Sequence, residues 1–226
     1  MTYLALTREE NVHVLTMTNG ENDNTFTYEV ISAYHARLDE IEKAAGNAAL
    51  IITSSHEKTW STGIDAPWFS EQTVREKKRF IREVSLLFLR MALLNLPTIA
   101  CITGNCYAAG AMMATAMDFR LMRADRGRFC FPEVNVKVPF GNIAGEILRL
   151  IPNPHARKEL VLTGVAWGGE KCLKEKVVDA IYPAAELPQK AYELAQMLAE
   201  KDRKTYTILK RDLKKHLVDL RERETA

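Results

Sequence analysis

The sequence lacks the patterns of a metal site, a disulfide framework or a nucleotide-binding loop. Its five histidines do not cluster at metal-ligand spacing, and its four cysteines form no CxxC pair. The phosphate-loop pattern GxxxxGKS/T, the dinucleotide pattern GxGxxG and the hydrolase elbow GxSxG are also missing. We therefore expect reduced thiols and no metal, nicotinamide or flavin.

Long apolar runs and an excess of one charge are absent as well. No apolar run reaches the roughly 18 residues that span a bilayer, and the first residues lack a basic segment followed by an apolar one. The 31 basic and 29 acidic residues give a net charge of +2, so the balance of charge offers no reason to invoke nucleic acid. We expect a cytoplasmic protein without a membrane or nucleic-acid partner.

Strand and helix patterns alternate along the chain. Val30, Tyr34, Leu38 and Ile41 fall on one helical face, and a second long helix is expected from Thr73 to Leu94. This alternation predicts an α/β layered fold with a mostly parallel sheet. Residues 1–185 would form the core and residues 186–226 a C-terminal helical segment. The predicted strands are a hairpin at 3–7 and 12–18, then 49–54, 96–104, 119–124 and 128–131.

The end of the chain reads as an amphipathic helix. Its leucines form a stripe that would dock on its own core or on a neighbouring subunit, while its basic residues would face away. Binding of nucleic acid by the basic face is the alternative. The leucines are Leu209, Leu213, Leu217 and Leu220, and the basic residues are Lys210, Arg211, Lys214 and Lys215.

Two glycine-containing junctions between a strand and a helix stand out, at residues 58–67 and 102–113. The first amides of a helix have no intrahelical acceptor, so two such junctions could supply an oxyanion hole. Either junction alone could equally be a structural turn. A third feature is Glu133, a single carboxylate in the otherwise apolar run FCFPEV, which could also be a surface residue at the end of an edge strand.

Together these segments resemble the crotonase superfamily, the enoyl-CoA hydratases and isomerases. The first signature of that family is met by KTWSTGID, the second by LPTIACITGNCYAAGAMMATAMD without a gap, and the third by FCFPE. GVAWGGEKCLKEKVVDAIYP also resembles a later helix and strand of the family, so the resemblance extends from about residue 3 to 220. It implies the crotonase-like ββα spiral fold with C-terminal helices.

The resemblance also implies roles for three groups. The amides of Ile64 and Ala109 match the two oxyanion donors, and Glu133 matches the catalytic position. Negative charge that develops on a thioester carbonyl oxygen would be stabilised by the two amides. Apolar surroundings would raise the pKa of Glu133 toward neutrality and suit it to act as a base. The second junction reads AAG where the family often has three glycines, so Ala108 and Ala109 add methyl groups beside the oxyanion.

One substitution distinguishes between members of the family. Hydratases carry two glutamates that hold a water, and the position of the first is occupied here by Met112. A single base suffices to move one proton between two carbons, so the pattern is closest to the delta-3,delta-2-enoyl-CoA isomerases of fatty-acid β-oxidation. Such an enzyme would take a proton from C2 of a 3-enoyl thioester and return it at C4.

Substrate contacts follow from the same resemblance. Lys58 would meet the phosphates of coenzyme A, and the backbone of Ile64, Asp65 and Ala66 would hold the adenine and pantetheine. Lys58 could also be a plain solvated lysine, and an aromatic residue near the site could be simple core. Coenzyme A is part of the substrate, so no separate cofactor is expected, and the family tends to form trimers or hexamers. The candidates for the acyl pocket are Trp60, Trp68, Phe69, Phe80 and Phe140.

Two other functions remain open at the level of the sequence. The same oxyanion hole serves hydratases, acyl-CoA hydrolases and decarboxylases. A catalytically silent protein that captures acyl-CoA, or RNA through its basic terminal helix, is the alternative of another class; the presence of Glu133 argues against it.

Overall fold

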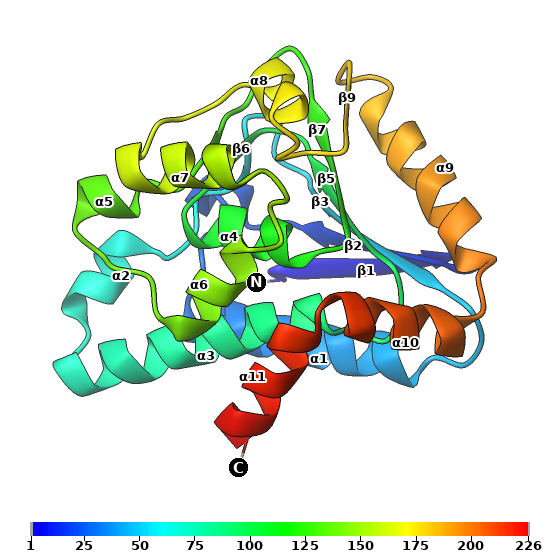
Figure 1. Cartoon of the computed structure of the whole chain (residues 1–226), viewed down its shortest axis with the longest axis horizontal. Coiled ribbons are helices and arrows are strands. Elements are labelled where there is room, and N and C mark those ends of the chain that lie inside the picture. The colour runs from blue at the N-terminus through cyan, green and yellow to red at the C-terminus, as the bar shows by residue number, and fades with distance from the viewer. Residues whose placement is uncertain (1, 226) are drawn as a thin grey trace.

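Six strands form the main sheet of the computed structural model, which describes residues 2–225 (Figure 1). They lie in the order β1-β2-β3-β5-β7-β9, and every neighbouring pair is parallel except the β1-β2 hairpin. The predicted hairpin and the mostly parallel sheet are confirmed. The strands are β1 (Leu4–Glu9), β2 (Val12–Met17), β3 (Ala49–Ser54), β5 (Thr98–Ile102), β7 (Phe119–Arg123) and β9 (Ala180–Tyr182).

Helices occupy most of the remaining chain. The second long helix begins at a capping box, in which Thr73 and Glu76 satisfy each other's backbone amides, and it ends two residues earlier than predicted. The helices are η1 (Gly20–Asn22), α1 (Tyr28–Lys43), α2 (Ala66–Glu71), α3 (Val74–Ala92), α4 (Ala109–Ala116), α5 (Glu133–Val136), α6 (Asn142–Leu148), α7 (Pro154–Thr163), α8 (Gly169–Lys174), α9 (Leu187–Ala199), α10 (Arg203–Leu213) and α11 (Lys215–Thr225).

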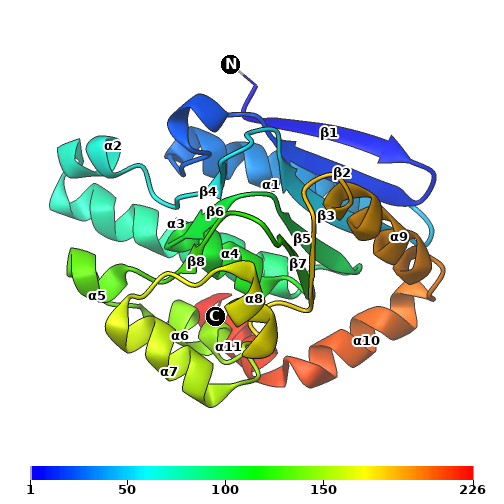
Figure 2. The same cartoon turned by 90° about the horizontal axis from the view of Figure 1, so that it is seen from above.

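Both faces of the main sheet are buried. Successive side chains of a strand point to opposite faces, so Leu50 and Ile52 of β3 join the larger core while Ala49 and Ile51 join a smaller one. The smaller core is completed by α9, which packs on that face of the sheet (Figure 2), and Tyr206 of α10 packs against it. The predicted boundary at residue 185 falls just before α9. Helix α9 packs on the sheet, with contacts to β2, β3, β5 and β7.

A second, smaller sheet determines where the reactive groups lie. Its strands β4 (Thr59–Ser61), β6 (Asn105–Tyr107) and β8 (Phe129–Cys130) pair in parallel, in the order β4-β6-β8. The carboxyl ends of parallel strands meet at one edge of a sheet. The chain leaves that edge toward Ile64, Ala109 and Glu133 respectively, which brings three distant segments together.

Close backbone approach joins the first two of these segments. A Cβ atom on Gly63 would lie 2.7 Å from the amide nitrogen of Ala109, and one on Gly110 would lie 2.6 Å from the carbonyl oxygen of Ser61. Gly63 also has a φ of +91°, which favours glycine. Ala108 has φ 49° and ψ −126°, a conformation that L-residues rarely adopt. The second junction therefore stores backbone strain.

The C-terminal segment differs from the single amphipathic stripe predicted for it. The helix breaks at Lys214, so Leu217 and Leu220 of α11 are buried, whereas Leu209 and Leu213 of α10 are 58% and 84% exposed. The two helices, drawn in orange and red in Figure 1, turn sharply at this residue. Lys210 and Lys214, predicted to face away, are instead buried. Fewer basic groups therefore reach the surface, which weakens the nucleic-acid alternative.

A buried carboxylate explains the position of these two lysines. The ammonium groups of Lys210 and Lys214 lie 2.8 Å and 2.7 Å from the two carboxylate oxygens of Asp118, at the end of α4. Burial alone would raise the pKa of Asp118, but the two ammonium groups lower it to about 2. Burial lowers the pKa of Lys210 to about 8 against the opposing effect of Asp118. Asp118 thus fastens the C-terminal helices to the core.

Within residues 2–225, no helix combines the length and the apolarity that crossing a bilayer requires.

We predict that Asp118→Asn lowers the free energy of unfolding by about 3 to 5 kcal/mol, because it leaves two buried ammonium groups without a counter-charge. Denaturant unfolding followed by circular dichroism measures the change. Asp212→Asn, at an exposed carboxylate of α10, is the matched control and should leave stability unchanged. A loss below about 1 kcal/mol for Asp118→Asn would show that the cluster does not hold the C-terminal helices.

We predict that Ala108→Gly raises the free energy of unfolding by about 1 kcal/mol, because glycine adopts this backbone conformation without strain. The same substitution at Ala111, inside α4, should lower it, since glycine weakens a helix interior. Both values come from denaturant titrations of the purified variants. Equal destabilisation by the two substitutions would contradict a strained Ala108.

Candidate active site

A single apolar cavity of about 420 Å³ lies where the three segments of the small sheet converge. Its wall combines the two strand-to-helix junctions, the segment after β8 and one face each of α3 and α6. Such a lining suits a hydrocarbon group. The lining residues are Thr62, Ile64, Ala66, Phe69, Ile81, Val84, Ser85, Phe88, Ala108, Ala109, Met112, Pro132, Glu133, Val136, Val138, Pro139, Phe140, Gly141 and Ala144.

Glu133 is the one ionisable side chain among these lining residues. It stands in the first turn of α5, directly after Pro132, and its Oε2 is buried without a hydrogen-bond partner in the part of the chain that the structure describes. Burial raises the pKa of Glu133 to about 7, although its own backbone amide partly opposes the shift. A carboxylate with that pKa can both take and release a proton near neutral pH.

Two backbone amides belong to residues that line the same cavity, Ile64 and Ala109. The amide of Phe26 donates to Gly63 O at 2.8 Å and that of Asp65 donates to Phe26 O at 3.1 Å, and this parallel bridge leaves the intervening amide of Ile64 on the opposite side. Ala109 is the first residue of α4 and has no intrahelical acceptor. Among residues 2–225, neither amide has a backbone or side-chain acceptor within hydrogen-bond distance. Both are available as donors to an anion.

The carboxylate of Asp65 has a structural task beside this site. It caps α2 by accepting from the Trp68 amide at 2.9 Å, and it accepts from the Asn22 side chain at 2.7 Å. These bonds tie the loop before α1 to the junction that carries Ile64. Asp65 therefore positions the first amide, and only its backbone remains for the predicted contact with coenzyme A.

The structure brings together some of the predicted substrate contacts and separates others. Ala66 and Phe140 line the cavity beside Ile64, Ala109 and Glu133. Lys58 is exposed and outside the lining, so its contact with phosphate stays a prediction. The ring of Trp68 also lies outside the lining and packs edge-on against two other aromatic rings, those of Tyr28 and Phe80.

Of the aromatic candidates for the acyl pocket, Phe69 and Phe140 line the cavity. Trp60 and Phe80 lie outside this lining and are completely buried in the core, which agrees with the alternative that an aromatic residue near the site is simple core. Sequence reasoning missed the wall contributed by α3, to which Val84 and Phe88 belong. The signal was the small polar Ser85, which interrupts the apolar face between them.

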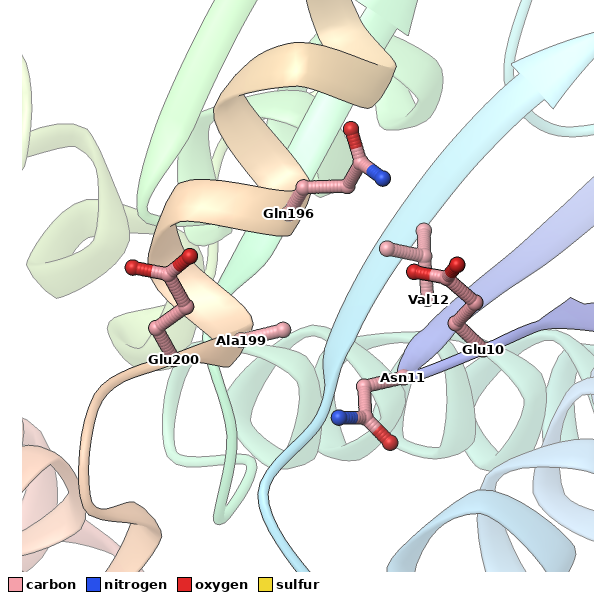
Figure 3. A pocket seen from close by; sticks show the side chains of 6 residues that line it. All are labelled: Glu10, Asn11, Val12, Gln196, Ala199 and Glu200. Carbon is pink, nitrogen blue, oxygen red and sulfur yellow. The ribbon is translucent and has the colours of Figure 1, made fainter.

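Another hollow lies far from Glu133, between the β1-β2 turn and the end of α9 (Figure 3). Its volume is about 380 Å³, and it is lined by Glu10, Asn11, Val12, Gln196, Ala199 and Glu200. In Figure 3 the Glu200 side chain points away from the gap toward which Glu10 and Gln196 point, so the polar groups do not converge. The residues that the structure describes contain no group of three His, Cys, Asp or Glu side chains able to hold a metal.

Known proteins with related sequences are enzymes of acyl-CoA metabolism by name. The chain is 26% identical over 202 residues to Enoyl-CoA delta isomerase 3 of Arabidopsis thaliana, a match that covers 87% of this chain and 84% of the relative. It is 25% identical over 193 residues to Short-chain-enoyl-CoA hydratase of Clostridium acetobutylicum, covering 85% and 74%. Relatives named for isomerisation and for hydration thus match to a similar degree.

Solved structures share the fold. An enoyl-CoA hydratase/isomerase family protein from Pseudomonas syringae superposes with a TM-score of 0.89 at 23% identity, over 96% of this chain and 92% of that one. Enoyl-CoA hydratase from Bacillus anthracis gives a TM-score of 0.86 at 19% identity, over 93% and 82%. The predicted crotonase-like fold is confirmed. A sequence model described as Enoyl-CoA hydratase/isomerase matches residues 7–226, so this chain belongs to the enoyl-CoA hydratase/isomerase family.

Proposed function

We propose that the protein is a delta-3,delta-2-enoyl-CoA isomerase, with Glu133 as its one acid and base. The observation that carries this proposal is the solitary Glu133 carboxylate, whose pKa is raised to about 7 by burial, in a cavity whose other lining side chains do not ionise. Movement of a double bond needs one group that takes a proton and returns it. Addition of water needs a second polar group to hold the water.

The reaction follows from the positions of the three groups. The thioester carbonyl oxygen accepts hydrogen bonds from the amides of Ile64 and Ala109. The Glu133 carboxylate removes a proton from C2 of a 3-enoyl thioester, and the electron pair of that C–H bond moves through C1 to the carbonyl oxygen, giving a dienolate. When Glu133 returns the proton at C4, the dienolate collapses to the 2-enoyl thioester and the carboxylate is regenerated.

The backbone amides of Ile64 and Ala109 stabilise the negative charge that develops on the thioester carbonyl oxygen. Both amides are fixed by secondary structure before substrate binds, so they need no reorganisation. By comparison with other oxyanion holes, each donor contributes roughly a hundredfold to a thousandfold in rate.

Met112 supports isomerisation over hydration. Met112 is 2% exposed and lines the cavity. The polar side chains of that lining are those of Glu133, Thr62 and Ser85. A thioether cannot take up a proton or orient a water. The hydratase relatives keep hydration as the second candidate, which would be favoured if water addition outpaced movement of the double bond.

Assembly and location are part of the proposal. Ile208, Leu209 and Leu213 on the outer face of α10 are more than half exposed, which supports association into the trimers or hexamers that the family resemblance implies. A cytoplasmic location stays a prediction, and some relatives are named as peroxisomal.

We predict that the purified protein converts a 3-enoyl-CoA to the conjugated 2-enoyl-CoA, with kcat/KM rising with pH through about 7. The sign follows because the base must be ionised and burial raises the pKa of Glu133 to about 7. Glu133→Gln should lower the rate at least about a hundredfold while the protein stays folded. Ultraviolet absorbance of the conjugated thioester measures the rate. A folded variant that keeps the wild-type rate would overturn the assignment of Glu133.

We predict that Met112→Glu adds hydration of 2-enoyl-CoA at least about tenfold above the wild type, because a second carboxylate can help Glu133 to hold a water. Loss of the conjugated absorbance reports hydration. Met112→Gln is the matched control, with a similar size but no ability to exchange a proton, and it should gain less. If a folded Met112→Glu hydrates no faster than the wild type, placement of water depends on more than this side chain.

A further inference from the structure

The loop of residues 22–26 runs beside the junction that carries Ile64. Asp23 and Asn24 both have a φ of 50°, in the left-handed region where asparagine and aspartate are enriched among residues other than glycine. The carbonyl oxygen of Asp23 accepts from the Thr62 amide at 3.1 Å. The backbone of this loop is thus paired with the backbone of the junction, two residues before Ile64.

The side chain of Asn24 connects this loop to both sheets. Asn24 is 3% exposed, and its Nδ2 donates to the Trp60 carbonyl oxygen in β4 at 3.0 Å and to the Ser54 hydroxyl in β3 at 2.8 Å. Its Oδ1 has no hydrogen-bond partner among residues 2–225, so the two donated bonds make the connection. One buried amide group therefore links the loop, the main sheet and the small sheet.

The backbone of Asn24 holds the junction at a second point. Its carbonyl oxygen accepts from the Ser61 hydroxyl at 2.9 Å, and the Ser61 hydroxyl oxygen accepts from the Gly63 amide at 3.2 Å. Gly63 directly precedes Ile64. Ser61 also lies against α4, because a Cβ atom on Gly110 would be 2.9 Å from the Ser61 hydroxyl oxygen. Asn24 thus holds the residues on which the orientation of the Ile64 amide depends.

We propose that Asn24 is a positioning residue of the oxyanion hole, which holds Ser61 so that the Ile64 amide donates to the thioester oxygen. Asn24 lies outside the lining of the cavity and acts through the backbone of the junction. The proposal rests on the proposed function of the same site. Misplacement of a group by about 1 Å can cost about a hundredfold in rate, so loss of Asn24 should weaken transition-state stabilisation more than substrate binding.

Asn24→Gly removes the side chain and places at this position a residue that adopts the left-handed conformation without strain. It should lower kcat for a 3-enoyl-CoA about tenfold to a hundredfold and leave KM within about threefold, because the uncharged thioester oxygen depends less on the donor than the oxyanion does. Ser54→Ala removes only one acceptor of the Asn24 side chain, so it should show a smaller loss of the same sign. Ultraviolet assays of the conjugated product measure both variants.

Acetoacetyl-CoA tests the oxyanion hole without isomerisation. Its enolate places part of the negative charge on the thioester oxygen and absorbs in the ultraviolet, so the absorbance gives the ratio of enolate to keto form of the bound ligand. This ratio should fall at least about tenfold in Asn24→Gly, because the misplaced amide stabilises the charge less. Calorimetry should give butyryl-CoA, which forms no such enolate, an affinity within about threefold of the wild type.

Asn153→Ala is the matched control, since it removes another asparagine side chain that makes several hydrogen bonds. Asn153 caps α7 by accepting from the His155 and Ala156 amides, and it lies outside the cavity lining. The variant should lower the midpoint of thermal unfolding but leave kcat and the enolate ratio within about twofold of the wild type. Circular dichroism verifies that each variant is folded at the assay temperature.

The outcomes separate the positioning role from the isomerase function. An unchanged enolate ratio in folded Asn24→Gly, an equal loss in Asn153→Ala, or acetoacetyl-CoA that stays in the keto form on the wild type would overturn the role of Asn24. Should Asn24→Gly fail to fold, the ratio in Ser54→Ala decides, because a fall supports the role and an unchanged ratio contradicts it. If the ratio falls as expected but the wild type isomerises no 3-enoyl-CoA, the positioning role holds and the isomerase function fails.

Discussion

Parallel pairing of three short strands is the constraint on which the site depends. β4, β6 and β8 contain only a few residues each, yet their pairing brings Ile64, Ala109 and Glu133 to one edge from positions far apart in the chain. The first two approach so closely that a single added Cβ at Gly63 would collide with the backbone of Ala109. The proposed oxyanion donors therefore depend on backbone geometry, and the side chains at these positions act mainly by permitting or preventing that geometry.

Two buried carboxylates show how the fold treats the same chemical group in opposite ways. Asp118 is enclosed by the ammonium groups of Lys210 and Lys214 and stays ionised, with its pKa lowered to about 2. Among the described residues Glu133 Oε2 has no hydrogen-bond partner, and burial raises the pKa of Glu133 to about 7. Paired charge serves to hold the C-terminal helices, whereas unpaired charge leaves a group ready to exchange a proton. The difference lies in the partners of each carboxylate and not in its depth.

Local patterns in the sequence predicted the alternating strands and helices, and the three spaced motifs led to the residues that surround the cavity. These patterns gave wrong predictions where the interaction partner of a side chain lies far away in the sequence. Lys210 and Lys214 look solvated beside four leucines at regular spacing, because nothing nearby in the sequence reveals Asp118, which precedes them by about a hundred residues. The break in the helix at Lys214 has the same origin, since its ammonium group also donates to the Ala92 and Ala116 carbonyl oxygens.

Trp60 and Phe80 show a different difficulty. An aromatic side chain next to a site motif can equally fill the core, as these two do.

Water placement connects the strain at Ala108 with the proposed choice of reaction. An ordered water in a protein interior needs about two to four polar partners. The cavity lining includes the methyl groups of Ala108 and Ala109 and the ring of Phe88. Its polar side chains are Glu133, Thr62 and Ser85, and the Ser85 hydroxyl already donates within α3. Alanine in place of glycine at position 108 costs backbone strain, but it adds one of these methyl groups beside the amides proposed to bind the carbonyl oxygen. An apolar wall that holds little water also keeps water away from the proposed dienolate. A single base facing such a wall favours return of the proton to carbon over addition of a hydroxyl group.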